Sequence, residues 1–191
     1  SDRHNDPMLG GRIKRTIRIL RMAANERPGE TAVVRPHVRR WIRDRWTFAD
    51  PLSHDRPWIV YEAADWLDGL VRPDWTIFEW GSGVSTLFFA RRAARVIAIE
   101  HLEGWRARVL DRLAREGLDN AEIRLVHGAQ PANAAVPVED HNLLDYTAYA
   151  AAIDEQPDAS LDLVMVDGQA RPRCIEHAVT KIRPGGWLVL D

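Results

Sequence analysis

Two acidic residues and two glycines stand at positions that suit the binding of a nucleotide. Glu79 lies two residues before Gly81, Gly83 follows one residue later, and Glu100 ends the next apolar run of the chain. The glycines allow a sharp turn and let a ligand come close to bare main chain. A carboxylate at the end of the neighbouring strand can accept hydrogen bonds from both hydroxyls of a ribose. These residue types therefore indicate a site for a ribose-containing ligand.

The elements around these residues read as strand, glycine turn, helix and strand. Residues 76–78 form a short apolar run with β-branched side chains first, which is typical of a strand buried on both faces. Residues 85–94 suit a helix, whose first N–H groups would be free to meet a polar or negative group. Residues 96–99 suit a second strand. This order is the first half of a nucleotide-binding α/β unit.

The glycine spacing separates two classes of cofactor that use such a unit. The dinucleotide fingerprint requires Gly or Ala at its third position, where this chain has Thr86. An acid two residues before Gly-x-Gly is the other pattern, and the run EWGSG at 79–83 fits it. Here the chain resembles the class I S-adenosylmethionine-dependent methyltransferases. The later runs VMVDG and RPGGWLVLD extend this resemblance over 58–191.

The resemblance implies a map of the cofactor site. Glu79 and the glycine turn would hold the methionine part, Glu100 would hold the ribose, and His101 would flank the adenine, with a surface histidine as the alternative. Many family members carry an acid after the third strand to bind the adenine amino group, whereas this chain has Ala129 there. The implied cofactor-binding residues are Glu79, Gly81, Ser82, Gly83, Ser85, Thr86, Glu100, His101, Gly128, Ala129 and Asp167.

The remaining elements predict an α/β fold with a three-layer, doubly wound parallel sheet. Strands and helices alternate, which favours right-handed crossovers between parallel strands. The segments 123–126, 161–166 (apolar except for Asp162) and 187–190 supply the third, fourth and fifth strands. We expect the strand order 3-2-1-4-5, with the ligand cleft between the first and fourth strands. The family usually adds an antiparallel pair of strands after the fifth, where this sequence stops at Asp191. We expect that the pair is missing by truncation, with completion of the fold by a partner as the alternative.

A methyltransferase also binds the molecule that accepts the methyl group. For this part of the site, Asp167 is the predicted catalytic residue, because it follows the fourth strand across the cleft from the glycine turn. Asp167 and Asp191 end adjacent strands and could bind a Mg²⁺ that acidifies an acceptor hydroxyl, as in catechol-type and some sugar O-methyltransferases. The alternative is that Asp167 only caps its loop or bonds the cofactor amine, since two oxygen ligands are too few to specify a metal. Arg171 and His141 are secondary candidates, and Arg171 could clamp an acidic or sugar-like acceptor.

Length and composition indicate one globular domain with an N-terminal extension. The chain has 191 residues, 46% hydrophobic and 28% charged, and its net charge of −2 argues against bulk attraction to nucleic acid. The single cysteine, Cys174, excludes an internal disulfide and a cysteine-rich zinc site. The sequence contains no apolar run of membrane-spanning length and no signal peptide, so we expect a cytoplasmic protein.

We expect residues 1–57 to form a basic helical extension and residues 58–191 to form the Rossmann-like domain. Residues 11–24 carry apolar side chains at helical spacing, with arginine and lysine on the other faces. That pattern fits peripheral contact with a membrane, or, as we favour, a helix packed on its own domain with a solvated basic face. Arginines and tryptophans alternate at 37–46, which fits base stacking or an arginine-rich helix that covers apolar surface.

Three functions follow from these observations. The first, which we favour, is an enzyme that uses S-adenosylmethionine to methylate an oxygen of a small molecule or glycan unit. The second is methylation of nucleic acid, which the arginine-rich N-terminal part supports and the net charge opposes. The third is a scaffold with the cofactor fold but no catalysis. Binding of S-adenosylmethionine separates the third from the others, and salt-dependent binding to RNA or DNA identifies the second.

Overall fold

The computed structural model describes residues 37, 40, 44, 50–132, 136, 138–140 and 143–191. The chain divides into two compact units, Ser1–Asp50 and Pro51–Asp191. Most of the first unit, including nearly all of the two helices expected there, lies outside the described residues. The membrane and base-stacking contacts expected of those helices therefore stay predictions, as does the division into 1–57 and 58–191.

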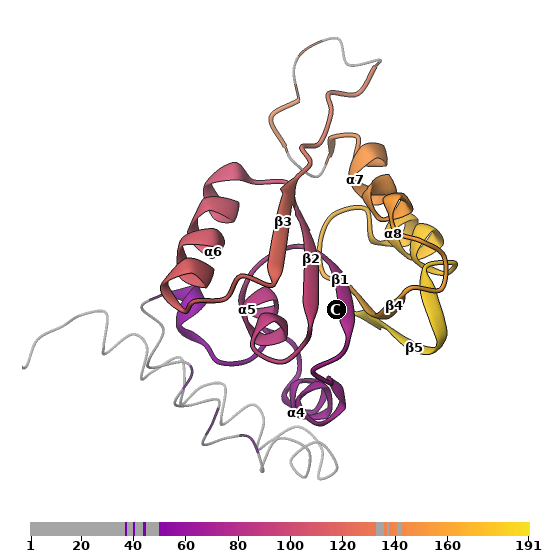
Figure 1. Cartoon of the computed structure of the whole chain (residues 1–191). Coiled ribbons are helices and arrows are strands. Elements are labelled where there is room, and N and C mark those ends of the chain that lie inside the picture. The colour runs from indigo at the N-terminus through magenta and orange to yellow at the C-terminus, as the bar shows by residue number, and fades with distance from the viewer. Residues whose placement is uncertain are drawn as a thin grey trace, which may run out of the picture. The chain divides into compact units, whose positions relative to one another are not determined.

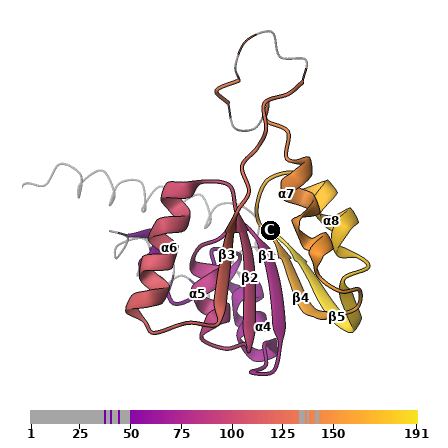
Figure 2. The same cartoon turned by 45° about the horizontal axis from the view of Figure 1, so that its top comes forward.

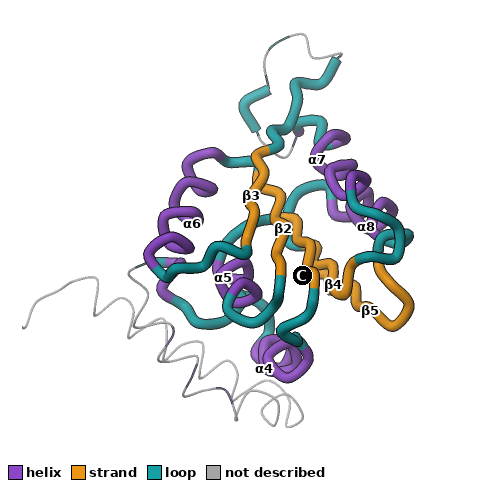
Figure 3. Tube along the Cα trace, viewed as in Figure 1, coloured by secondary structure: helices purple, strands orange, loops and turns teal. Residues whose placement is uncertain are grey.

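The second unit is built on a five-stranded sheet in which every pair of neighbouring strands is parallel (Figure 1). Its strands are β1 (Thr76–Trp80), β2 (Arg95–Glu100), β3 (Ala121–Leu125), β4 (Leu161–Val166) and β5 (Ile182–Leu190). They lie side by side through the middle of the unit in the order β3-β2-β1-β4-β5, which confirms the predicted order (Figure 3). The switch point of this order, where a doubly wound fold opens a cleft, lies between β1 and β4.

Helices cover both faces of the sheet, so the unit has three layers (Figure 2). One face is covered by α4 (Tyr61–Leu70), α5 (Val84–Ala90) and α6 (Glu103–Arg115). The other is covered by α7 (Thr147–Ala151) and α8 (Arg171–Ala178). Two short 3₁₀ turns, η2 (Pro51–Ser53) and η4 (Ala152–Glu155), complete the described elements. Within the described ranges, no helix combines the length and apolar character that a membrane span requires.

Alternate residues of each strand enter one of two apolar cores. Ile77 and Val96 pack with Leu87 in the core beneath α5. Phe78 and Tyr149 belong to the core beneath α7 and α8. β1, β2 and β4 are buried along most of their length and appear in the sequence as nearly continuous apolar runs, whereas the edge strands β3 and β5 are less buried.

Two elements differ from the sequence prediction. The helix expected over 85–94 ends at Ala90, after which a short turn brings the chain back into β2. The fifth strand, expected over 187–190, begins already at Ile182, and the Pro-Gly-Gly run at 184–186 lies inside it as a bulge, because Leu161 and Leu163 of β4 pair with residues five apart on β5, at 182 and 187. Gly186 suits this bulge, since a Cβ there would lie 2.9 Å from the Asp162 carbonyl oxygen.

Candidate active site

The glycine turn follows β1 and meets the ends of β2 and β4. Gly81 has a φ of +88°, and its N–H donates to the Ile99 carbonyl oxygen at 2.8 Å. A Cβ on Gly81 would overlap the carbonyl oxygen of Asp167. Both the positive φ and the close approach therefore require glycine at this position.

Gly83 borders open space instead. Its backbone is extended, with a φ of 167°, and a Cβ there would meet nothing closer than the ring of Trp105, at 3.8 Å. Trp105 of α6 donates its indole N–H to the Ser82 carbonyl oxygen at 2.6 Å and so holds the turn. The Gly83 N–H donates to Thr86 Oγ1 at 2.9 Å, which makes Thr86 a cap of α5. The local sequence around Trp105 gives no sign of its contact with Ser82, because the two residues are 23 apart in the chain.

Glu79 is fully buried against the first turn of α5, and neither carboxyl oxygen has a hydrogen-bond partner among the described residues. Burial raises the pKa of Glu79 to about 8. The nearby hydroxyls of Thr86 and Ser85 oppose the rise without reaching normal hydrogen-bond geometry, and the charges of Asp167 and Glu100 add to it. A buried acceptor without a donor is costly, so the site favours a ligand that brings a donor to Glu79.

Glu100, at the end of β2, is held by four hydrogen bonds. Oε1 accepts from the N–H groups of His101 at 2.8 Å and Leu102 at 2.9 Å, and Oε2 accepts from the N–H and hydroxyl of Ser82 at 3.1 and 2.8 Å. Burial alone would raise the pKa of Glu100, but the bonds from His101, Leu102 and Ser82 outweigh it and lower the pKa to about 2. The group is thus a permanent carboxylate, and the Ser82 hydroxyl stands where a ribose hydroxyl could replace it.

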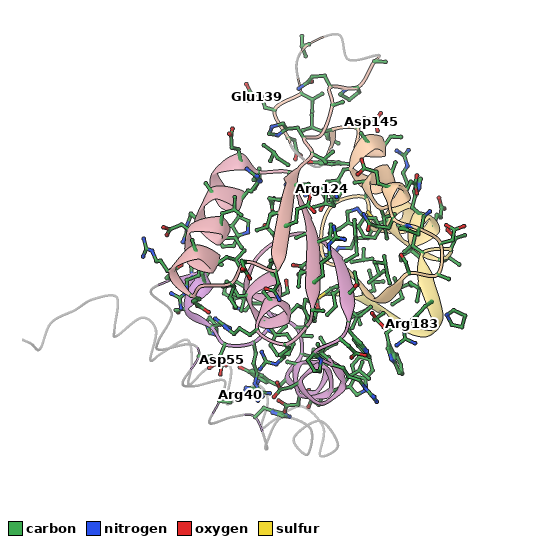
Figure 4. The ribbon with its side chains drawn as sticks, in the orientation of Figure 1. Arg40, Asp55, Arg124, Glu139, Asp145 and Arg183 are labelled. Carbon is green, nitrogen blue, oxygen red and sulfur yellow. The ribbon has the colours of Figure 1, made fainter. Side chains whose placement is uncertain are left out.

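The residues after β3 pair with the segment that precedes α7. Ala129 and Asp145 exchange two backbone hydrogen bonds of 2.8 Å, so the main-chain donor and acceptor of Ala129 are both used (Asp145 is labelled in Figure 4). A Cβ on Gly128 would lie 2.8 Å from Leu144 Cβ and 2.9 Å from Tyr146 Cζ. Gly128 and Ala129 therefore contribute through the packing of their backbone to one wall of the site, formed by residues 128–129 and 144–146.

Three rings gather beside this wall. The ring of His101 lies edge to face with Tyr146 and Tyr149, at centroid distances of 5.8 and 6.1 Å. The Tyr149 hydroxyl donates to the Ile99 carbonyl oxygen at 3.4 Å, whereas the buried Tyr146 hydroxyl has no partner among the described residues. The sequence did not single out either tyrosine as a site residue, because nothing in the local pattern shows whether a buried hydroxyl is satisfied.

Asp167 lies at the end of β4 with 35% of its side chain exposed. Burial and the charge of Asp191 raise its pKa to about 6, while Arg171 acts in the opposite direction. Arg171 donates to Asp167 Oδ1 and to the Gly168 carbonyl oxygen, each at 3.2 Å, and also contacts the Asp191 carbonyl oxygen. This guanidinium stands beside the two expected metal ligands, and no described group of three side chains could hold a metal. The donor set therefore does not fit the Mg²⁺ site expected from the sequence.

A pocket of about 420 Å³ lies between the segment before α7 and the loop before α8. Leu143 and Ala170 contribute apolar surface, and Tyr146 and Gln169 also line the pocket, whereas Asp167 is not among its lining residues. Arg173 also lines it and donates to the Thr147 hydroxyl at 2.8 Å. The secondary candidate at position 141 lies outside the described residues.

Most of the predicted site residues therefore lie at the carboxyl end of the sheet. The glycine turn joins them, because Gly81 packs against the Asp167 main chain and Ser82 donates twice to Glu100. Ser85 and Thr86, by contrast, are buried in the first turn of α5.

Comparison with known proteins confirms the fold. No family model and no curated protein matches the chain. A precorrin 8w decarboxylase of Methanobacterium thermoautotrophicum is similar over 71% of this chain and 64% of its own length, with a TM-score of 0.51 and 20% identity. An rRNA methylase of Streptococcus thermophilus is similar over 75% of this chain and 72% of its own, with a TM-score of 0.50 and 15% identity. The chain thus spans less than two thirds of the first protein, and the shared feature is the Rossmann-like fold that the resemblance to class I methyltransferases implied.

Proposed function

We propose that the protein is an S-adenosylmethionine-dependent methyltransferase. The observation that carries this proposal is the buried, unpartnered carboxyl of Glu79 beside the ionised Glu100 at one glycine turn. S-adenosylmethionine has an ammonium group on its methionine part and a diol on its ribose, which lies between the sulfur and the adenine. A buried acceptor that lacks a donor and a fixed carboxylate are the groups that would receive them.

Each residue of the turn has a part in this proposal. Glu79 would accept from the ammonium group, and Glu100 would accept from the ribose hydroxyls once Ser82 Oγ moves aside. Gly83 keeps the space beside the turn free of side chain. When bound, the cofactor supplies a methyl group on a positively charged sulfur, which the acceptor takes by in-line displacement.

We further propose that the acceptor is an oxygen of a small molecule or glycan unit. The pocket lined by Tyr146, Gln169 and Arg173 has a volume typical of small-molecule sites. The pKa of Asp167, about 6, lies close to neutral pH, which suits a general base that removes the acceptor proton. Arg171 would keep this carboxylate oriented through its contact with Oδ1. The proposed reaction uses no metal, because the donor set at Asp167 and Asp191 does not fit one.

Calorimetry with S-adenosylhomocysteine, the demethylated form of the cofactor, tests the cofactor assignment. We expect the wild type to bind it, and Glu100→Ala to bind at least ~10-fold more weakly, since charged hydrogen bonds each contribute about 1.5–3 kcal/mol. Asp167→Asn is the matched control, because it neutralises a carboxylate at the same edge of the sheet. Its affinity should stay within about three-fold of the wild type, which is a change in binding free energy smaller than the contribution of one ordinary hydrogen bond.

Two results would contradict this assignment. One is equal affinity of wild type and Glu100→Ala for S-adenosylhomocysteine, and the other is a preference for NAD over it. Circular dichroism should show that both variants are folded. Glu100→Gln serves as a second variant that keeps the side-chain volume if the alanine variant is unstable.

A further inference from the structure

We propose that the Tyr146 hydroxyl binds the purine base of the nucleoside, at the place where this chain has no acid after β3. The inference rests on the proposed function and adds to it the residue that recognises the base. The Tyr146 side chain is only 5% exposed, and its hydroxyl is buried without a hydrogen-bond partner among the described residues. A buried hydroxyl in that condition is costly, so a ligand that satisfies it gains affinity.

The position of Tyr146 relative to Glu100 fits this role. His101 connects the two, because its Nδ1 lies 3.1 Å from Glu100 Oε1 and its ring lies 5.8 Å from the Tyr146 ring. In a nucleoside, the base is bonded to the carbon next to the diol. A ribose held by Glu100 would therefore carry its base toward the group of rings that includes Tyr146.

The hydrogen-bonding groups of Ala129, the residue at the place of the missing acid, are already paired. The N–H and carbonyl of Ala129 are both bonded to Asp145, and the methyl side chain of Ala129 offers no hydrogen bond. Gly128 has no side chain, and its Cα faces the tip of the Tyr146 ring, since a Cβ would lie 2.9 Å from Tyr146 Cζ. The main chain of Ala129 is thus paired, whereas the tyrosine hydroxyl has no partner among the described residues.

A hydroxyl at this place would select the base differently from a carboxylate. A carboxylate only accepts hydrogen bonds and so selects an amino group, whereas a hydroxyl both donates and accepts. Burial and the charges of Asp140 and Glu100 raise the pKa of Tyr146, so the hydroxyl keeps its proton at neutral pH. It can accept from a 6-amino purine or donate to a 6-oxo purine. We therefore expect the site to bind adenosyl and inosyl ligands about equally.

The test uses S-adenosylhomocysteine and S-inosylhomocysteine, which differ at one position of the base. Calorimetry should give wild-type affinities within about three-fold of each other, and Tyr146→Phe should weaken both by roughly 3- to 10-fold, the loss of one neutral hydrogen bond. Tyr61→Phe on α4 is the control for removal of a tyrosine hydroxyl elsewhere and should change neither affinity. Without ligand, Tyr146→Phe should melt no earlier than the wild type, because the hydroxyl it lacks is unsatisfied in the free protein.

The outcomes separate this inference from the proposed function. If the wild type binds S-adenosylhomocysteine but Tyr146→Phe binds both ligands as tightly, the role of Tyr146 is wrong and the cofactor assignment stands. Rejection of the inosyl ligand by about 100-fold or more, roughly 2.7 kcal/mol, would overturn the inference in the same way. If the wild type binds neither ligand, both proposals are wrong.

A second measurement needs no variant. In protein labelled at its tyrosine rings, nuclear magnetic resonance should show the Tyr146 signal shifting with S-adenosylhomocysteine but not with homocysteine, which has no base. An unmoved signal at saturation would overturn the inference.

Discussion

At the scale of single residues, the two acids of the glycine turn lie in opposite electrostatic environments. Glu79 has lost water without gaining a donor, and its pKa is raised to about 8. Glu100 has also lost water, but four donors replace it, and its pKa is lowered to about 2. At neutral pH the site therefore presents one protonated and one ionised carboxyl group, although the side chains are chemically identical.

This difference predicts proton release on ligand binding. Below about pH 8 Glu79 is mainly protonated, and an ammonium group beside it favours the ionised form, so binding of S-adenosylhomocysteine at pH 7 should release close to one proton. Affinity should accordingly rise as the pH is raised from 6 to 8 and then level off. Calorimetry in buffers of different ionisation enthalpy counts the released protons.

Glu79→Gln provides the control for proton release, because its amide has no proton to lose in this range. Its binding enthalpy should be the same in every buffer, and its affinity should be lower and flat between pH 6 and 8. A wild-type enthalpy that does not depend on the buffer would show that Glu79 does not meet the ammonium group.

At the scale of elements, the two glycines of the turn serve different purposes. Gly81 is required by the fold, because its φ is positive and a Cβ would overlap the Asp167 carbonyl oxygen where the loops after β1 and β4 cross. Gly83 has an extended backbone and open space around its Cα, so the fold does not require glycine there. Under the proposed function, the glycine at position 83 leaves the space that the ligand needs.

We therefore predict that Gly83→Val folds normally and loses binding of S-adenosylhomocysteine, because the branched side chain fills the ligand's space. Gly81→Ala is the matched comparison and should lose more than about 1 kcal/mol of stability, since alanine is strained at positive φ. Thermal denaturation and calorimetry on the two variants measure these effects. An unfolded Gly83→Val, or one that binds normally, would contradict the role given to Gly83.

The sequence predicted the sheet and the glycine turn because both depend on local patterns. Apolar runs mark strands buried on both faces, and the ends of parallel strands meet at one edge of the sheet. The pairing of Ala129 with Asp145 could not be predicted, because it joins two loop segments that carry no periodic signal. Nor could the bulge at 184–186, where Pro-Gly-Gly favours a turn but pairing with β4 keeps the segment in the strand.

The Tyr146 hydroxyl was missed for a related reason. Whether a buried polar atom finds a partner depends on every segment that packs around it. Here those neighbours come from the loops after β2 and β3, which are distant in sequence from α7.

At the scale of the whole unit, β5 forms an edge of the sheet and is paired, among the described strands, only with β4. It exposes Trp187, Leu188 and Leu190, and the ring of Trp187 lies edge to face with Trp66 of α4 at 4.9 Å. An edge with unpaired backbone groups and apolar side chains is a template for pairing with another chain.

This edge predicts self-association of the 191-residue chain as its concentration rises. Leu188→Lys should weaken the association, because a charge on an edge strand opposes pairing. Val60→Lys places the same charge at an exposed apolar residue outside β5 and should leave the association unchanged. Analytical ultracentrifugation over a concentration series measures the association of the wild type and of the two variants. A monodisperse wild type, or equal effects of the two lysines, would show that β5 does not pair.

The bond between Trp105 and the glycine turn also has an optical consequence. Its indole N–H is fixed on the Ser82 carbonyl oxygen, its ring borders the open space beside Gly83, and the guanidinium of Arg108 lies 5.0 Å above it. The emission of an indole depends on its hydrogen bond and on the charges around it. A ligand that displaces Ser82 would change both, so the fluorescence of this tryptophan reports, without any added label, whether the turn is open or filled.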